Sequence, residues 1–113
     1  MKVLKFGGSS VQNAENIVKA VGIIKENLQK EHVIIVVSAL GGITNKLIDC
    51  CNKAVNGDKS FVDMLAEIKT AHFETINSLL KGDAKTECEK NTEAILAELH
   101  DILHGILLIR ELT

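Results

Sequence analysis

The stretch Lys5-Phe6-Gly7-Gly8-Ser9-Ser10 organises this chain, because a short apolar strand over residues 3–6 runs into paired glycines and two hydroxyl residues. Glycine has no Cβ, so it allows positive φ and lets an anion approach the backbone, while the N–H groups of a following helix start point at that anion. Ser9 and Gln12 have capping-box spacing, which predicts the helix start. Lys5 would add positive charge. The pattern favours a phosphate-binding loop over a tight turn without a ligand, although GxxxxGK[ST] is absent.

A helix and a second strand follow this loop. Residues 11–29 have helical apolar spacing, and residues 33–37 form a β-branched run without alternation, as expected for a strand buried on both faces of a parallel sheet. The helix residues that we expect to face the core are Ala14, Ile17, Val18, Val21, Ile24 and Leu28. A right-handed βαβ crossover would bring the loops after both strands to one edge of the sheet, where ligands bind in such folds.

The loop after the second strand is a second candidate site. Ser38 and a further glycine pair lead to Thr44 and Asn45, which open a helix expected to reach about residue 54. A hydroxyl and an amide at a helix start suit a substrate carboxylate; equally, Thr44 would serve as an N-cap. These residues alone do not separate the two alternatives. The predicted inward face of this helix comprises Leu47, Ile48, Cys51 and Val55.

Two stretches resemble a known family. The first resembles the KFGGSS or KFGGTS signature that opens the aspartokinases, enzymes of the amino-acid kinase family. Residues 37–45, Val-Ser-Ala-Leu-Gly-Gly-Ile-Thr-Asn, resemble the V-S-A-x-x-x-I-T-N segment after the second strand of those enzymes. The resemblance is specific over residues 1–48 and looser beyond, where Leu-His-Gly-Ile at 103–106 is similar to a segment in aspartokinases fused to homoserine dehydrogenase.

The resemblance implies an activity and its residues. Aspartokinases transfer the γ-phosphoryl group of ATP, with Mg²⁺, to the side-chain carboxylate of L-aspartate, giving 4-phospho-L-aspartate on the route to lysine, threonine and methionine. The implied roles are catalysis by Lys5, nucleotide binding by Lys5, Gly7, Gly8 and Ser9, and aspartate binding by Ser38, Thr44 and Asn45. In the family, the acidic catalytic residue, the adenine pocket and the regulatory domains lie beyond residue 113. We therefore expect an N-terminal piece of a longer enzyme, inactive alone.

Two rival functions stay open. Another amino-acid kinase, acting on acetylglutamate, glutamate, carbamate or UMP, would share the glycine loop, although Phe6 and the segment at residues 43–45 favour aspartokinase. A non-catalytic module for anion binding or assembly is the alternative from a different class.

Composition narrows the partners and the location. The 113 residues are 46% hydrophobic and 25% charged, with a formal net charge of -2 and no basic cluster, so neither nucleic acid nor a membrane is predicted as a partner. The absence of a signal sequence predicts a cytoplasmic location. The three cysteines lack CxxC spacing, which disfavours disulfides and zinc. His100 and His104 imitate HExxH without a third ligand, so we predict no metal site.

The predicted fold is an α/β amino-acid kinase fold, represented by its N-terminal βαβ unit and a helical segment. We divide residues 1–113 into a βαβ and substrate-loop region over 1–58 and a helical segment over 59–113. One helix should start at Ser60, with an apolar stripe from Phe61 to Leu79, and end at Gly82. Another should start at Thr86, place Cys88, Ile95, Leu99 and Leu103 on one face, and break near Gly105. Two strands make an incomplete sheet, whose exposed apolar surface favours a homo-oligomer.

Overall fold

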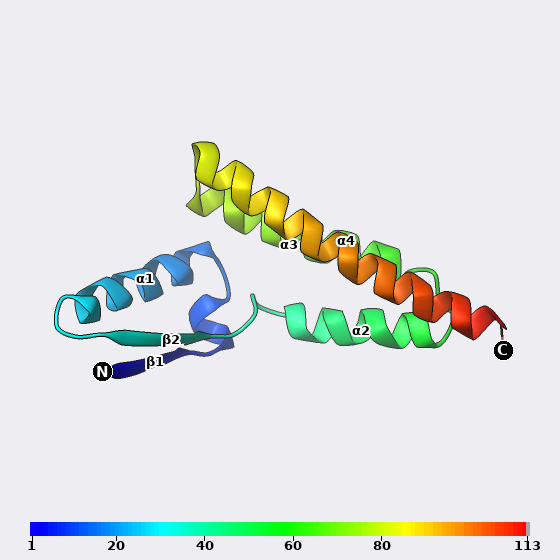
Figure 1. Cartoon of the computed structure of the whole chain (residues 1–113), viewed down its shortest axis with the longest axis horizontal. Coiled ribbons are helices and arrows are strands. Elements are labelled where there is room, and N and C mark those ends of the chain that lie inside the picture. The colour runs from blue at the N-terminus through cyan, green and yellow to red at the C-terminus, as the bar shows by residue number, and fades with distance from the viewer. Residues whose placement is uncertain (113) are drawn as a thin grey trace. The chain divides into compact units, whose positions relative to one another are not determined.

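The first two strands and the helix between them form the predicted βαβ unit. The computed structural model describes residues 1–112, in which β1 (Lys2–Phe6) and β2 (Val33–Val37) pair in parallel and α1 (Ala14–Leu28) connects them (Figure 1). In the ladder, Lys2 lies opposite Val33, and Phe6 lies opposite Val37. The α/β class is therefore confirmed, and the second strand has the predicted bounds.

The start of α1 differs from the prediction. A 3₁₀ turn, η1 (Gly8–Val11), follows the glycines, and α1 begins only at Ala14. Asn13 is the N-cap, with extended backbone, and its Oδ1 accepts a hydrogen bond from Asn16 N at 3.0 Å. The predicted capping box of Ser9 and Gln12 is wrong, because Ser9 lies inside the turn and no side chain caps η1.

The inward face of α1 was predicted only in part. Phe6, Val11 and Ala20 form the buried cluster of this unit, and Leu4, Ile17 and Ile24 pack against it. The expected core residues Val18, Val21 and Leu28 are instead exposed. Helical periodicity places several apolar stripes on this helix, and contact with β1 selects one of them.

The second strand is much more exposed than its composition predicts. Residues 34–37 are between 43% and 62% exposed, although all four are Ile or Val. Within residues 1–42, β2 has one strand neighbour, and the helix packed on the pair is α1. The apolar run is typical of a strand buried on both faces, so its burial requires elements that this unit does not contain.

The residues from Ile43 onward form a second compact unit of three helices. Its helices are α2 (Ile43–Val55), α3 (Phe61–Leu79) and α4 (Gly82–Leu112), and each packs against the other two (Figure 1). Phe61, Ile68, Leu103 and Cys50 are fully buried. The stripe predicted for α3 is confirmed, since Phe61, Leu65, Ile68 and Ile76 are its buried residues.

Four details of the other two helices were predicted wrongly. Ile48, Cys51 and Val55 of α2 face outward, because Ile43, Cys50 and Ala54 take the buried positions. The last helix begins at Gly82 and continues through Gly105 without a break. Thr86 lies inside this helix, where its hydroxyl donates to the Gly82 carbonyl at 3.3 Å, and Ile95 is 66% exposed.

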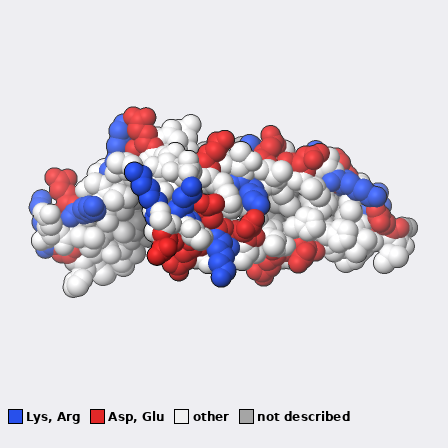
Figure 2. Space-filling view, turned by 90° about the horizontal axis from the view of Figure 1, so that it is seen from above, with Lys and Arg blue, Asp and Glu red and all other residues white. Residues whose placement is uncertain are grey.

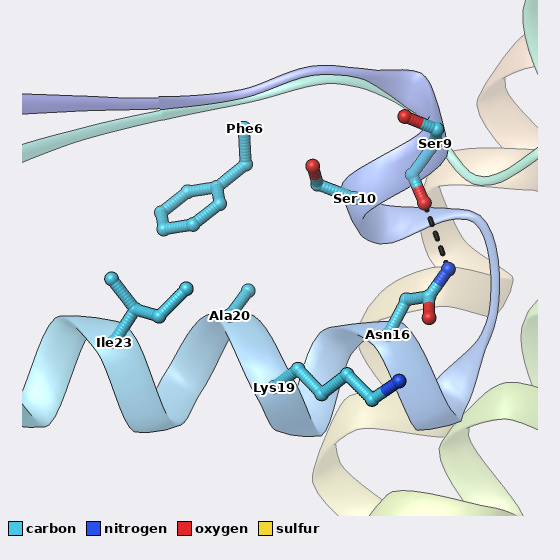
Figure 3. A pocket seen from close by; sticks show the side chains of 7 residues that line it. All are labelled: Phe6, Ser9, Ser10, Asn16, Lys19, Ala20 and Ile23. Atoms are coloured by element: carbon cyan, nitrogen blue, oxygen red, sulfur yellow. Dashed lines mark hydrogen bonds between the residues drawn. The ribbon is translucent and has the colours of Figure 1, made fainter.

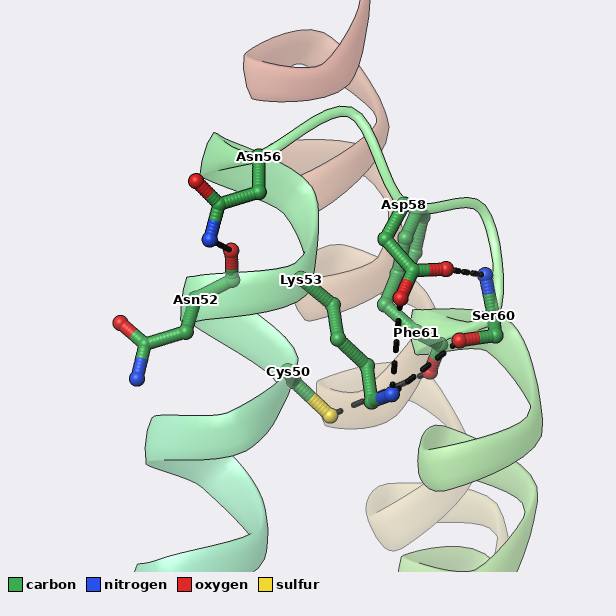
Figure 4. A network of polar contacts seen from close by, with 7 residues as sticks. All are labelled: Cys50, Asn52, Lys53, Asn56, Asp58, Ser60 and Phe61. Atoms are coloured by element: carbon green, nitrogen blue, oxygen red, sulfur yellow. Dashed lines mark hydrogen bonds and ion pairs between the residues drawn. The ribbon is translucent and has the colours of Figure 1, made fainter.

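A polar network closes the turn between α2 and α3 (Figure 4). Lys53 Nζ lies 3.2 Å from Ser60 Oγ and 3.6 Å from Asp58 Oδ2, while Asp58 Oδ1 accepts a hydrogen bond from Ser60 N at 2.9 Å. The hydrogen bonds from the Ser60 hydroxyl and then from its backbone N–H lower the pKa of the Asp58 carboxyl. Gly57 supplies the positive φ of 76° that this turn requires. The network therefore fixes where α3 begins.

Candidate functional site

The loops after β1 and β2 lie side by side at one edge of the sheet. The ladder continues one step past the strands, because Ser38 N donates a hydrogen bond to the Phe6 carbonyl at 3.1 Å. A Cβ built on Gly8 would lie 3.9 Å from Ser38 Oγ, which is ordinary van der Waals contact. The structure thus brings together Gly8 and Ser38, two of the predicted site residues, at the edge where ligands bind in parallel sheets.

The first loop leaves its backbone open without using positive φ. Gly7 is extended, with φ -75° and ψ -179°, and neither Gly7 nor Gly8 has positive φ, so that part of the prediction is wrong. A Cβ on Gly7 would meet no atom within 4 Å. The loop turns through a hydrogen bond from Ser10 N to the Gly7 carbonyl at 3.0 Å. Its suitability for an anion therefore rests on missing side chains, since the α-helix begins only at Ala14.

Lys5 is an unpaired cation beside this loop. Leu4 and Phe6 pack toward α1, so Lys5, which lies between them on β1, projects from the opposite face of the sheet. Its side chain is exposed and makes no ion pair or hydrogen bond with any residue in 1–112. Its ammonium is accordingly available to an anion.

A cavity of about 270 Å³ lies between β1 and α1, next to the first glycine loop (Figure 3). It is on the face of β1 opposite to the face from which Lys5 projects. Its floor is apolar and is formed by Phe6, Ala20 and Ile23. The polar residues around it are Ser9, Ser10, Asn16 and Lys19. Asn16 Nδ2 donates a hydrogen bond to the Ser9 carbonyl at 2.8 Å and so ties the loop to α1. Asn16 was not identified from the sequence. Its position three residues after Asn13 could have indicated that the two residues form a helix cap.

The second loop is fastened to the first by a glycine that sequence reasoning left without a role. Gly41 N donates to the Gln12 carbonyl at 3.3 Å. Gly42 then has a positive φ of 77° and leads directly into α2. Two adjacent glycines thus serve different purposes: one permits close approach and the other permits a left-handed backbone.

Thr44 and Asn45 lie in the first turn of α2 and are exposed. Because the helix begins at Ile43, Thr44 is not its N-cap, and that alternative is wrong. Both residues belong to the second compact unit, whereas Lys5, Gly8 and Ser38 belong to the first.

The described residues offer no protein-built metal centre. Within residues 1–112, no group of three or more His, Cys, Asp or Glu side chains is placed to hold an ion. The His100 and His104 rings stack with centroids 6.0 Å apart, and Asp101 lies 3.6 Å from His100 Nδ1. No ligand for the Mg²⁺ that the resemblance implies is assigned among these residues.

On the face seen in Figure 2, surface charge marks no further site. Blue and red side chains are interspersed over the face seen in Figure 2, without a patch of one sign. None of the helices within residues 1–112 combines the length and hydrophobicity needed to cross a membrane.

The chain is similar to proteins named aspartokinase. The chain is 39% identical to aspartokinase 2, chloroplastic, of Arabidopsis thaliana, over 98% of this chain and 20% of that protein. It is 32% identical to the bifunctional aspartokinase/homoserine dehydrogenase of Buchnera aphidicola, over 98% of this chain and 14% of the relative. Identity to an aspartokinase of Rickettsia prowazekii is 36%, over 84% of this chain and 22% of that protein. The chain thus spans less than a quarter of each of these relatives.

The family model for the amino acid kinase family matches residues 1–104. This match covers both strands, both glycine loops and most of the helical unit. The chain belongs to the amino acid kinase family.

Proposed function

We propose that this chain is the N-terminal part of an aspartokinase, an enzyme that transfers the γ-phosphoryl group of ATP to the side-chain carboxylate of L-aspartate. The observation that carries the proposal is the pair of glycine loops at one sheet edge, in a chain that aligns over 98% of its length with relatives named aspartokinase. In the reaction, a carboxylate oxygen of aspartate forms a bond to the γ-phosphorus while the bond to the β,γ-bridging oxygen breaks. The products are 4-phospho-L-aspartate and ADP.

The first loop would hold the phosphate groups of ATP. Catalysis of phosphoryl transfer consists mainly of positioning and charge stabilisation, which requires donors and cations rather than a protein nucleophile. The open backbone at Gly7 and Gly8, the Ser9 hydroxyl and the unpaired Lys5 ammonium offer these groups. Lys5 would contribute to catalysis by neutralising negative charge on the transferred group.

The second loop and the start of α2 would hold aspartate. Ser38 lies next to the first loop, where a Cβ built on Gly8 would be in van der Waals range of the Ser38 hydroxyl, so a carboxylate bound there would sit near the phosphoryl group. Thr44 and Asn45 supply an exposed hydroxyl and amide at a helix start, where negative charge is stabilised. Asparagine and threonine donors suit both carboxylates of aspartate.

The remaining groups would come from outside residues 1–113. Mg²⁺ assists phosphoryl transfer by neutralising phosphate charge. We recognise none of three parts in residues 1–113: the Mg²⁺ ligands, the acidic catalytic residue and the adenine pocket. We propose that the complete enzyme is cytoplasmic and homo-oligomeric. Fusion to homoserine dehydrogenase is a further proposal, supported by the Buchnera relative.

An acceptor panel tests the function. The full-length gene product, given ATP and Mg²⁺, should release ADP with L-aspartate at least about 100-fold faster than with acetylglutamate, glutamate, carbamate or UMP, since a site built for one acceptor's polar groups rejects others by such factors. Hydroxylamine trapping of the acyl phosphate formed with L-aspartate identifies the product. Preference for another acceptor would identify a different amino-acid kinase. Absence of transfer to any acceptor, with ATP still bound, would favour the non-catalytic module. The isolated 113 residues should form no aspartyl phosphate.

A further inference from the structure

The two loops meet at Gln12 and Gly41, beyond the end of the strand ladder. A Cβ on Gly41 would lie 2.6 Å from Gln12 Cγ and 3.3 Å from the Gln12 carbonyl oxygen. The best separation for such atoms is about 3.5 to 4.0 Å, so a side chain at position 41 would force one partner to move. Gly41 does not have positive φ. Glycine is therefore needed at position 41 because the two loops approach each other closely there, and not because the backbone has an unusual conformation.

Gln12 lies on a well-anchored part of the first loop. Its neighbour Val11 is buried in the core of this unit, and its other neighbour, Asn13, caps α1. Asn16, which completes that cap, also holds the Ser9 carbonyl at 2.8 Å. The Gln12 backbone is thus fixed from both sides, so we expect a clash at position 41 to move residues 39–42 and not Gln12.

We propose that Gly41 is a positioning residue: its lack of a side chain, packed against Gln12 and hydrogen-bonded to the Gln12 main chain, sets the distance between the phosphate-binding loop and the loop that leads into the aspartate-binding residues. This inference rests on the proposed function. Ser38 is held to the strand end by its hydrogen bond to Phe6, so a displacement caused at position 41 falls on residues 39–42, directly before Thr44 and Asn45. Each loop would keep its own ligand contacts while the donor and the acceptor moved apart.

Such a displacement has a distinctive kinetic signature. Misplacing reacting groups by a fraction of an ångström lowers kcat strongly, by up to about 100-fold for 1 Å. Binding of each substrate, and hence each KM, changes little when its own contacts survive. A residue that only stabilises the fold would lower the amount of folded enzyme and leave kcat per folded molecule unchanged.

The test combines one damaging substitution with one that relieves it, in the full-length enzyme. Gly41→Ala should lower kcat per folded molecule at least about 10-fold, with KM for ATP and for aspartate within about 2-fold of wild type. Gln12→Ala removes Cγ but retains the main-chain acceptor, so it should leave kcat near wild type alone and restore most of it in the double variant. Gly22→Ala is the matched control, because a Cβ there meets no atom within 4 Å.

Two results would overturn the inference: an unchanged kcat in Gly41→Ala, or a loss that Gln12→Ala does not restore. If the wild-type enzyme does not phosphorylate aspartate, the proposed function fails separately. Thermal unfolding of the 113-residue chain then decides whether the two positions are coupled. A double-mutant cycle should show that Gly41→Ala lowers Tm less when Gln12 is Ala. Additive effects on Tm would show that the side chains at positions 12 and 41 do not interact, which would contradict the inference.

Discussion

The βαβ unit and the three-helix unit differ in how completely they bury their apolar residues. In the helical unit, Phe61, Ile68 and Leu103 are each 1% exposed, and three helices share one core. In the βαβ unit, the smallest exposure of any core residue is 6%, at Ala20, and most of β2 is open. The helical unit therefore contains its own stabilising contacts, whereas the βαβ unit carries the candidate site on a sheet that needs further elements.

This difference separates stability from chemistry along the chain. The open loops and the unpaired Lys5 ammonium lie in the unit with the smaller core. Substitutions in the core of the helical unit should consequently act on folding, and those at the sheet edge and at the exposed start of α2 should act on catalysis or substrate binding. Four substitutions, taken from the largest expected effect to the smallest, test that division.

The largest effect should follow from Phe61→Ala in the helical unit. Removing a fully buried phenyl ring leaves a cavity and should lower the free energy of unfolding by about 3 to 5 kcal/mol. Urea unfolding of the 113-residue chain, with hydrogen exchange of individual amides, measures the loss. Val62→Ala, at a neighbouring residue that is 47% exposed, is the control. An equal loss of protection in the β1–β2 ladder would break the comparison, because the two units would then unfold together.

Lys5→Met should have the largest effect on catalysis. If the ammonium stabilises charge on the transferred phosphoryl group, its loss should lower kcat of the full-length enzyme by about 10² to 10³, with a smaller change in KM for aspartate. Lys5→Arg should recover only part, because a planar guanidinium does not replace a compact ammonium. Lys30→Met removes another exposed lysine, at the opposite end of the sheet, and should leave kcat unchanged. Near-wild-type kcat in Lys5→Met would show that Lys5 is only a solvated strand residue.

Thr44→Ala should change substrate binding more than the chemical step. A contact with the aspartate carboxylate that persists through the reaction raises KM when it is removed, here by about 10-fold, which corresponds to one hydrogen bond to a charged group. Initial rates at varied aspartate and saturating ATP separate KM from kcat. Thr70→Ala, at another exposed helical threonine, is the control. An unaltered KM would show that Thr44 does not contact aspartate and is only a residue of the α2 helix. The division between the two units would then be sharper.

Asp58→Asn should produce the smallest effect and one that depends on pH. The folded protein holds the pKa of this carboxyl below its ordinary value, so the stability it contributes is present above the unfolded pKa and is lost as pH falls through the folded pKa. The variant should unfold more easily than wild type near neutral pH, and the two should converge in acid. Urea midpoints across that range provide the measurement. Asp49→Asn is the control, since Asp49 has no ion pair or hydrogen bond within residues 1–112. A constant difference across the range would mean that the amide also disturbs the turn.

The local order of strands, loops and helices followed from the sequence. The β-branched run at 33–37 and the apolar stripe of α3 predict elements whose observed bounds agree closely, because backbone preference and periodicity act over a few residues. Both glycine loops were also recognised, and with them the resemblance to a kinase family.

Tertiary structure alone decided which faces are buried and how the loops touch. Val18 and Ile17 of α1, or Cys51 and Cys50 of α2, are adjacent along the chain, and only the surface packed against each helix determines which one turns inward. The fit of Gly41 against Gln12 likewise depends on groups brought together by parallel strand pairing. The start of α1, by contrast, depends on the local hydrogen bond between Asn13 and Asn16. Contacts between residues 29 positions apart leave no local pattern, since their spacing is set by packing and not by the period of any one element.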